Sequence, residues 1–143
     1  MRLRATPEAV FPLLCPVREH DWIDSWRCTM VCSVTGRAEL DCVFRTAFAA
    51  DGPEDTWVIS RYEPPRRIEF VRINPLRAMR YAIALRPLGP GETEAVWRQV
   101  VTGLGDEGEQ FVRSLDDTAF AARMAVLERM LNHYLETGAM LKP

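Results

Sequence analysis

Three titratable side chains stand together early in the chain, at Glu19, His20 and Asp21. A carboxyl or imidazole group can move protons as a general acid or base, or can anchor the polar end of a ligand. Successive helix residues point about 100° apart, so at most two of the three can face one site. A solvated helix surface is the alternative interpretation. We take Glu19 and His20 as candidates that guard the mouth of a cavity.

His133 is the third candidate for chemistry and lies near the end of a predicted C-terminal helix. A histidine there gains from the helix dipole, or is simply exposed; a place in a cavity wall is the other hypothesis. The chain has only two histidines, which are too few for a histidine-rich metal site. No spacing of carboxylates or thiols suggests another ligand set, so we expect neither a metal nor a cofactor.

The four cysteines are Cys15, Cys28, Cys32 and Cys42. Alternating apolar and polar residues around Cys28 and Cys32 indicate a strand, on which the two thiols stand about 13 Å apart. That distance is too long for the pair alone to bind zinc. We expect buried structural thiols, with Cys15, near Arg18 and His20, as the exception most apt to react. The role of the four thiols stays open.

Several functional classes are disfavoured by composition. The net charge is −2, with 18 basic and 20 acidic residues, which gives no general attraction for nucleic acid. No apolar run is long enough to span a bilayer, and the first residues lack the apolar stretch of a signal peptide. We therefore expect a cytoplasmic protein with reduced thiols.

Two further patterns have plain interpretations. Solvent-facing strand positions explain most of the arginines, and a patch for phosphate or anionic lipid is the alternative; these arginines are Arg2, Arg4, Arg66, Arg67, Arg72, Arg77, Arg80 and Arg86. Gly103, Gly105 and Gly108 match the letters of a dinucleotide-binding motif. The chain lacks the strand–helix–strand unit that this motif needs, so we interpret it as a flexible corner.

The predicted elements change from short helices to strands and then to one long helix. Residues 2–6 could form a first strand, and Thr6 with Pro7 is typical of a helix start. Pro16 ends that helix, and a second short helix covers about 17–24. Alternation predicts six more strands, at 26–34, 42–48, 56–62, 67–73, 79–85 and 93–102. Tight loops between them predict an antiparallel meander.

The last part of the chain predicts a single helix over 106–136, about 45 Å long. Asp106 and Glu109 suit its start, and Gly138 suits its end. Only this helix is long enough to cover the apolar face of the sheet. Small residues near its middle, such as Ala119 and Ala122, either widen a gap beneath it or allow a close approach. The 143 residues, 48% of them hydrophobic, fit a single α+β domain over 1–143.

The order of these elements resembles the START-like superfamily, also called SRPBCC. The residues that carry the resemblance are the run Thr6–Phe11, Trp22 and Trp26, the strand 66–70 and the long final helix. The run Cys15–Ile23 resembles a bacterial subgroup with no assigned chemistry. The resemblance implies a helix-grip fold, in which a curved antiparallel sheet wraps around the C-terminal helix and leaves a cavity. The superfamily includes lipid carriers, plant hormone and allergen-type binders, polyketide cyclases and activators of a chaperone ATPase, and the fold alone does not choose among them.

Aromatic and methionine side chains on the faces turned toward the helix suit an apolar or planar ligand, although a dry core would use the same residues. The candidate ligand-binding residues are Trp26, Met30, Phe44, Thr46, Tyr81, Ile83, Trp97, Gln99, Ala119, Ala122, Val126 and Met130. The leading hypothesis is binding of a small hydrophobic or amphipathic molecule. One alternative is a cyclase- or dehydratase-like enzyme that uses the same cavity. Another is a chaperone-activator-type interaction module, which predicts a filled cavity and an exposed apolar patch.

Overall fold

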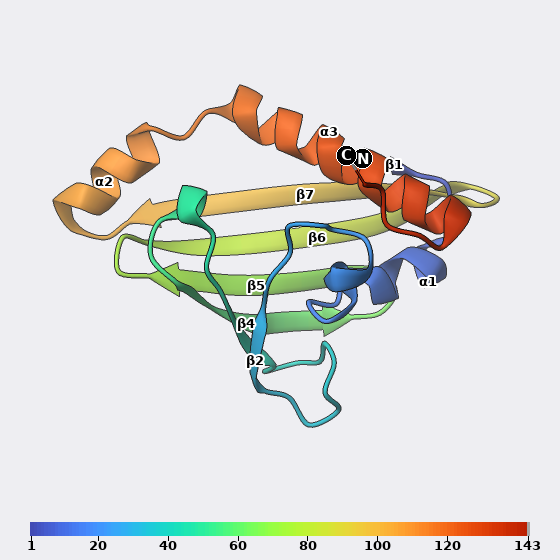
Figure 1. Cartoon of the computed structure of the whole chain (residues 1–143), viewed down its shortest axis with the longest axis horizontal. Helices are drawn as coiled ribbons and strands as arrows, with labels where there is room; N and C mark the ends of the chain where they lie inside the picture. The colour runs from blue at the N-terminus through green and yellow to red at the C-terminus, as the bar shows by residue number, and fades with distance from the viewer. Residues whose placement is uncertain (143) are drawn as a thin grey trace.

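A seven-stranded antiparallel sheet forms the centre of the computed structural model, which describes residues 1–142 (Figure 1). The strand order is β1-β7-β6-β5-β4-β3-β2, so neighbours in sequence pair directly from β2 to β7 and β1 closes the far edge. The strands are β1 (Arg2–Leu3), β2 (Thr29–Cys32), β3 (Val43–Thr46), β4 (Asp55–Glu63), β5 (Arg67–Asn74), β6 (Arg77–Gly89) and β7 (Glu92–Gly103). The predicted meander is confirmed.

Three short helices lie between β1 and β2, a fourth lies between β3 and β4, and two longer helices follow β7. They are α1 (Pro7–Val10), η1 (Phe11–Leu14), η2 (Arg18–Asp21), η3 (Ala49–Asp51), α2 (Gly105–Arg113) and α3 (Asp117–Thr137), the η elements being 3₁₀ helices. The hydroxyl of Thr6 accepts a hydrogen bond from the backbone N–H of Ala9, as expected for the residue before a helix that begins with proline. Within residues 1–142, no helix is both long and apolar enough to cross a membrane.

The predicted single helix over 106–136 is wrong, because the chain breaks between α2 and α3. The Asp116 carboxylate caps α3 by accepting hydrogen bonds from the N–H groups of Thr118 and Ala119, at 2.9 and 3.3 Å. The apolar period continues through the break, so periodicity alone could not show it. Leu104, rather than Asp106, is the residue before α2, and it makes no side-chain cap. Gly138 ends α3 in the left-handed region with φ of 69°, as predicted.

A close backbone contact between α2 and the sheet explains two of the three glycines of the dinucleotide-like motif, Gly103 and Gly108. A side chain at Gly108 would place its Cβ 2.0 Å from the carbonyl oxygen of Leu76, and one at Gly103 would meet the backbone of Gly108 at 2.6 Å. The backbone N–H of Leu104 donates to the same Leu76 oxygen at 2.8 Å. These glycines therefore allow α2 to pack tightly on the end of β7.

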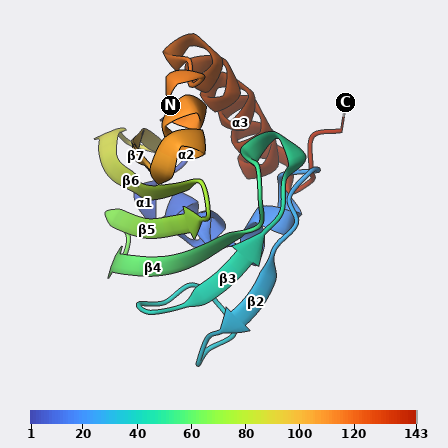
Figure 2. The same ribbon diagram turned by 90° about the vertical axis from the view of Figure 1, so that its left-hand side faces the viewer.

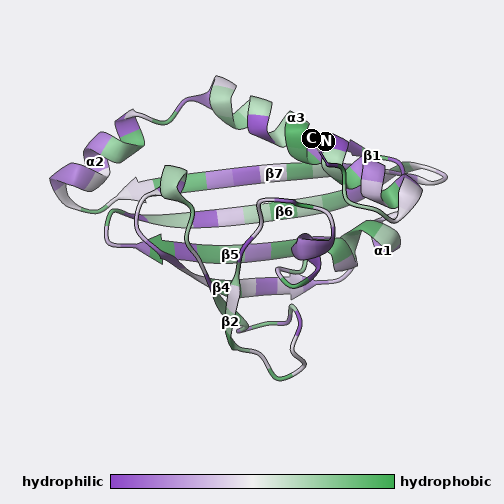
Figure 3. Ribbon diagram, viewed as in Figure 1, coloured by the Kyte–Doolittle hydropathy of each residue, from purple (hydrophilic) through white to green (hydrophobic). Residues whose placement is uncertain are grey.

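The two faces of the sheet differ in hydropathy, and the strands are banded accordingly in Figure 3. The inner face carries the core, which includes Ile59, Ile68 and Leu85 and continues into Trp22 and Leu131 of the covering elements. The outer face carries polar residues and some exposed valines and isoleucines. The sheet curls from β7 to β2 beneath the C-terminal helices (Figure 2). Because α3 packs chiefly through its second half, its first turns stand away from the sheet (Figure 1).

Candidate ligand-binding site

A cavity of about 370 Å³ lies between the inner face of the sheet and the elements η2, η3 and α3. This volume falls within the range of about 300–1,000 Å³ that is usual for small-molecule sites. Seven aromatic side chains form much of the wall: Trp26, Phe44, Phe48, Trp57, Phe70, Tyr81 and Trp97. Aliphatic and methionine side chains, chiefly from α3, form much of the rest.

The aromatic wall is held by ring-to-ring packing. Phe44 and Trp57 stack with ring centroids 5.3 Å apart, and Phe70 meets both edge-on. Tyr81 lies edge-on to Trp97 at 5.7 Å. These distances are within the favourable range for aromatic pairs, so the wall is a packed surface rather than a set of independent side chains.

Among the described residues that line this cavity, Glu19 is the only buried carboxylic acid. It lies on η2, is 9% exposed and lines the cavity. Burial raises the pKa of its carboxyl from 4.5 to about 8. No other cause contributes to this pKa shift, and no arginine, lysine or histidine pairs with the carboxyl within residues 1–142. Glu19 is therefore mostly uncharged at neutral pH and is able to donate a hydrogen bond.

Tyr81 and Gln99 face each other across the β6–β7 pair and bring two more polar groups to the cavity. Tyr81 is 8% exposed, and burial raises the pKa of its phenol far above the ordinary value. The charge of an ionised Glu19 raises this pKa further, and the Gln99 side chain partly offsets the rise. The hydroxyl thus stays protonated throughout the usual pH range.

Solved structures share this architecture, although no family model and no curated protein matches the sequence. A protein of Rhodobacter sphaeroides is 22% identical, with a TM-score of 0.63 over 94% of this chain and 89% of its own. The Aha1 dimer from Colwellia psychrerythraea gives a TM-score of 0.63 at 12% identity, over 96% of this chain and 93% of its own. DynU16, from the dynemicin biosynthetic locus, gives 0.61 at 18% identity over 97% of this chain.

The chain has a helix-grip fold, and it shares this fold with the solved structures above. It spans about half the length of DynU16, since the match covers 46% of that protein. At these identities the likeness concerns the fold, and the contents of the cavity must be argued from its own residues.

Eight of the twelve predicted ligand-binding residues line the helix-grip cavity. That these residues contact a ligand stays a prediction. They are Trp26, Phe44, Tyr81, Ile83, Trp97, Gln99, Val126 and Met130. The five strand residues on β6, β7 and β3 were placed by alternation, and Val126 and Met130 by the helical repeat. Leu127 and Met124 of α3 also line the cavity, and the same repeat could have identified them.

The other four predicted residues lie outside the cavity wall. The Thr46 hydroxyl accepts a hydrogen bond from Trp57 Nε1 at 2.8 Å, so its polar partner comes from the protein itself. Met30 packs on the core, with its sulfur 3.5 Å from Cys42 Sγ. Ala119 and Ala122 are exposed, because the first turns of α3 stand away from the sheet.

Of the three candidates for proton transfer, only Glu19 reaches the cavity. His20 is exposed, and its Nε2 lies 3.4 Å from Cys28 Sγ. His133 belongs to a separate surface hollow beside Arg4 and Asn132. A catalytic role for either histidine in the cavity is therefore not supported by its position.

The four cysteines differ in how deeply they are buried. Cys15 and Cys42 are buried, Cys28 is half-buried and Cys32 is exposed, and all four are free. The expectation of four buried thiols is thus wrong for Cys32, which follows an irregularity in the pairing of the edge strand β2. Cys15 accepts a hydrogen bond from the Ala38 N–H, so it is not the accessible thiol of the set.

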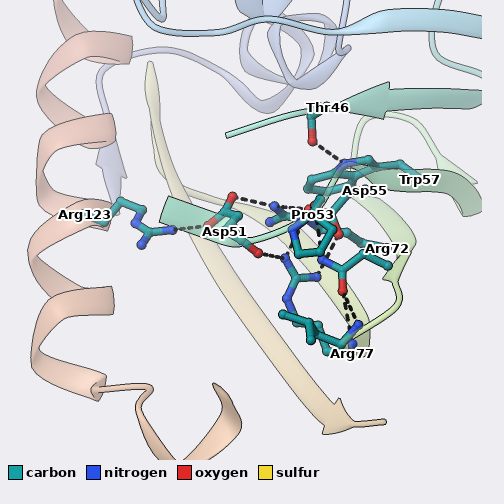
Figure 4. A network of polar contacts seen from close by, with 10 residues as sticks. Thr46, Asp51, Pro53, Asp55, Trp57, Arg72, Arg77 and Arg123 are labelled. Atoms are coloured by element: carbon teal, nitrogen blue, oxygen red, sulfur yellow. Dashed lines mark hydrogen bonds and ion pairs between the residues drawn. The ribbon is translucent and has the colours of Figure 1, made fainter. Parts of the chain in front are cut away.

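An ion network beside the cavity was missed by sequence analysis (Figure 4). Asp55, at the start of β4, accepts a hydrogen bond from Arg72 Nε at 2.8 Å and two from the Arg77 guanidinium at 3.0 and 3.1 Å. Asp51 of η3 pairs with Arg72 and lies 3.8 Å from Arg123 of α3. The Arg72 guanidinium sits 4.5 Å from the centroid of the Trp57 ring.

The interpretation of Arg72 and Arg77 as solvent-facing is therefore wrong, since their side chains are 5% and 1% exposed. Arg72 shares a strand face with Ile68 and Phe70, so alternation contained the signal. The network ties η3 to the sheet and fixes one rim of the cavity.

Proposed function

We propose that the helix-grip cavity binds a small, largely apolar molecule. The observation that supports this most strongly is a cavity of about 370 Å³ whose lining includes seven aromatic side chains. A chain that served only as an interaction module would be expected to fill this space with side chains. Most of the lining residues are apolar, which suits a ligand that has a hydrophobic body and few polar atoms.

Titration with the neutral dye N-phenyl-1-naphthylamine tests this function, because its fluorescence rises in a dry site. We expect saturable binding at one site per chain. Val126→Trp, on the cavity side of α3, should weaken binding by filling the space, whereas Val96→Trp, on the outer face of β7, should not. Absence of saturable binding, or equal effects of the two variants, would contradict the proposal.

A second candidate function is an enzyme that moves protons on the bound molecule, and Glu19 is the observation that favours it. A buried carboxyl with a pKa of about 8 can both donate and accept a proton near neutral pH. Deuterium uptake at the α-carbon of a bound ketone in D₂O, followed by mass spectrometry, tests this candidate. Uptake should depend on Glu19 and fall to the uncatalysed rate in Glu19→Gln; no enhancement by the wild-type chain would refute it.

A further inference from the structure

Two cavity-lining polar side chains are more than nine-tenths buried and still face open space. Glu19 is 9% exposed and Tyr81 is 8% exposed. Some buried polar atoms lack both contact with solvent and a hydrogen-bond partner, but the Glu19 carboxyl and the Tyr81 hydroxyl are not among them. No ion pair reaches Glu19 within residues 1–142. Buried polar groups are nearly always hydrogen-bonded in native proteins. A partner for the Glu19 carboxyl, and an acceptor for the proton of the Tyr81 hydroxyl, can therefore arrive with the ligand.

The Trp97 indole N–H, in contrast, does not face the open space of the cavity. Its Nε1 has no hydrogen-bond partner among the described residues, but surrounding protein atoms close it off from the cavity. We therefore place the ligand's polar contacts at Glu19 and Tyr81, with Gln99 beside Tyr81. Glu19 comes from η2, Tyr81 from β6 and Gln99 from β7, and all three line the same cavity.

The charges around the cavity disfavour a cationic group on the ligand. Arg72 and Arg123 line the wall together with Asp51, and Asp55 and Arg77 lie behind it. With an uncharged Glu19, this set carries three positive and two negative charges, so a ligand ammonium group would meet net repulsion. A neutral oxygen acceptor meets none, and both the Glu19 carboxyl and the Tyr81 hydroxyl have a proton to donate to it.

We propose that the ligand is an aromatic ketone or a similar planar carbonyl compound, whose oxygen accepts hydrogen bonds from Glu19 and Tyr81. Gln99 is a positioning residue that orients the Tyr81 hydroxyl. This inference rests on the proposed binding function and adds the chemical class of the ligand. The aromatic body of such a compound would lie against Trp97, Phe44 and Trp57.

Three naphthalenes of matched shape test the inference by calorimetric titration. 2-Acetylnaphthalene carries the carbonyl, 2-isopropenylnaphthalene replaces its oxygen by a CH₂ group, and 1-(2-naphthyl)ethylamine carries an ammonium group. We expect the ketone to bind at least about tenfold more tightly than the alkene, which corresponds to one well-made hydrogen bond. The amine should bind most weakly of the three.

Variants assign the preference to its residues. Glu19→Leu and Tyr81→Phe should each reduce ketone binding toward that of the alkene and leave alkene binding nearly unchanged. Glu19→Gln keeps a donor and should retain part of the preference. Circular dichroism confirms that each variant is folded, and an alkene affinity equal to that of the wild type confirms that the cavity is intact.

The outcomes separate this inference from the function on which it rests. Equal binding of ketone and alkene would overturn the inference and leave a cavity for apolar molecules. Preferential binding of the amine would also overturn it and would assign Glu19 as a counter-ion. Failure of all three to bind, together with failure of the dye, would overturn both. A ketone preference that survives Glu19→Leu and Tyr81→Phe would refute the assigned residues.

Discussion

Replacing Glu19 by glutamine should make the chain more stable, and the gain should grow with pH. The folded-state pKa of Glu19 is about 8, against 4.5 for a free carboxyl, because burial disfavours the charged form. The unfolded chain therefore binds fewer protons than the folded chain between these two values. The contribution of the Glu19 carboxyl to the free energy of unfolding is fully present below pH 4.5, and it is lost as the pH rises through about 8. Glutamine has no such ionisation, so Glu19→Gln removes this loss.

The magnitude follows from the shift. Each pKa unit corresponds to about 1.36 kcal/mol, so the three units between pH 5 and pH 8 correspond to about 4 kcal/mol. This is an upper value, since the carboxyl keeps some exposure toward the cavity and water there lowers the cost of its charge. Over this interval, the wild-type free energy of unfolding should fall by up to that amount relative to Glu19→Gln.

Urea denaturation at pH 5 and at pH 8.5, followed by circular dichroism, measures the effect. Glu8→Gln is the matched control, because Glu8 is an exposed carboxylate of α1. Its free energy of unfolding should follow the wild type at both pH values. Parallel pH dependence of the wild type and Glu19→Gln would refute the claim that Glu19 is buried uncharged.

Five further substitutions test the packing of the chain and the assignment of the cavity wall. Asp55→Ala leaves two buried guanidinium groups without their shared partner and should cost about 3–5 kcal/mol in urea denaturation; a loss below 1 kcal/mol would contradict the network. Gly108→Ala would bring a Cβ to 2.0 Å from the Leu76 oxygen and should lower the melting temperature, while Gly89→Ala, in open space, should leave it nearly unchanged. Trp97→Ala should abolish dye binding and Met30→Ala should preserve it, since only Trp97 lines the cavity; the reverse result would show that the wall is misassigned.

Local signals in the sequence predicted most of the sheet and the first helix. Thr6 and Pro7 identify a helix start by chemistry that acts within one turn. Alternation placed Tyr81 and Gln99 on the inner face, and it works because the side-chain period of a strand is two. The break before Asp116 was not predicted, because the apolar repeat runs through it and only the cap chemistry of Asp116 marks the new helix.

The polar part of the site depended on contacts between distant segments. The spacing of Glu19, His20 and Asp21 indicated that at most two could face a cavity, but not which, since that depends on how η2 docks on the sheet. Asp55 and Arg77 lie 22 residues apart, and their pairing becomes visible only when β4, β5 and β6 are side by side. Met30 lies on a short edge strand with irregular pairing, where alternation predicts the orientation of side chains less well.

Native mass spectrometry of the purified chain, without added ligand, tests the central claim most directly. Spectra would be recorded for the wild type and for Val126→Trp, and any adduct would be extracted and identified. We predict a stoichiometric adduct of small-molecule mass on the wild type that is absent or reduced in Val126→Trp. The bare chain mass in every preparation, combined with no binding by any apolar probe, would contradict the claim that this cavity holds a ligand.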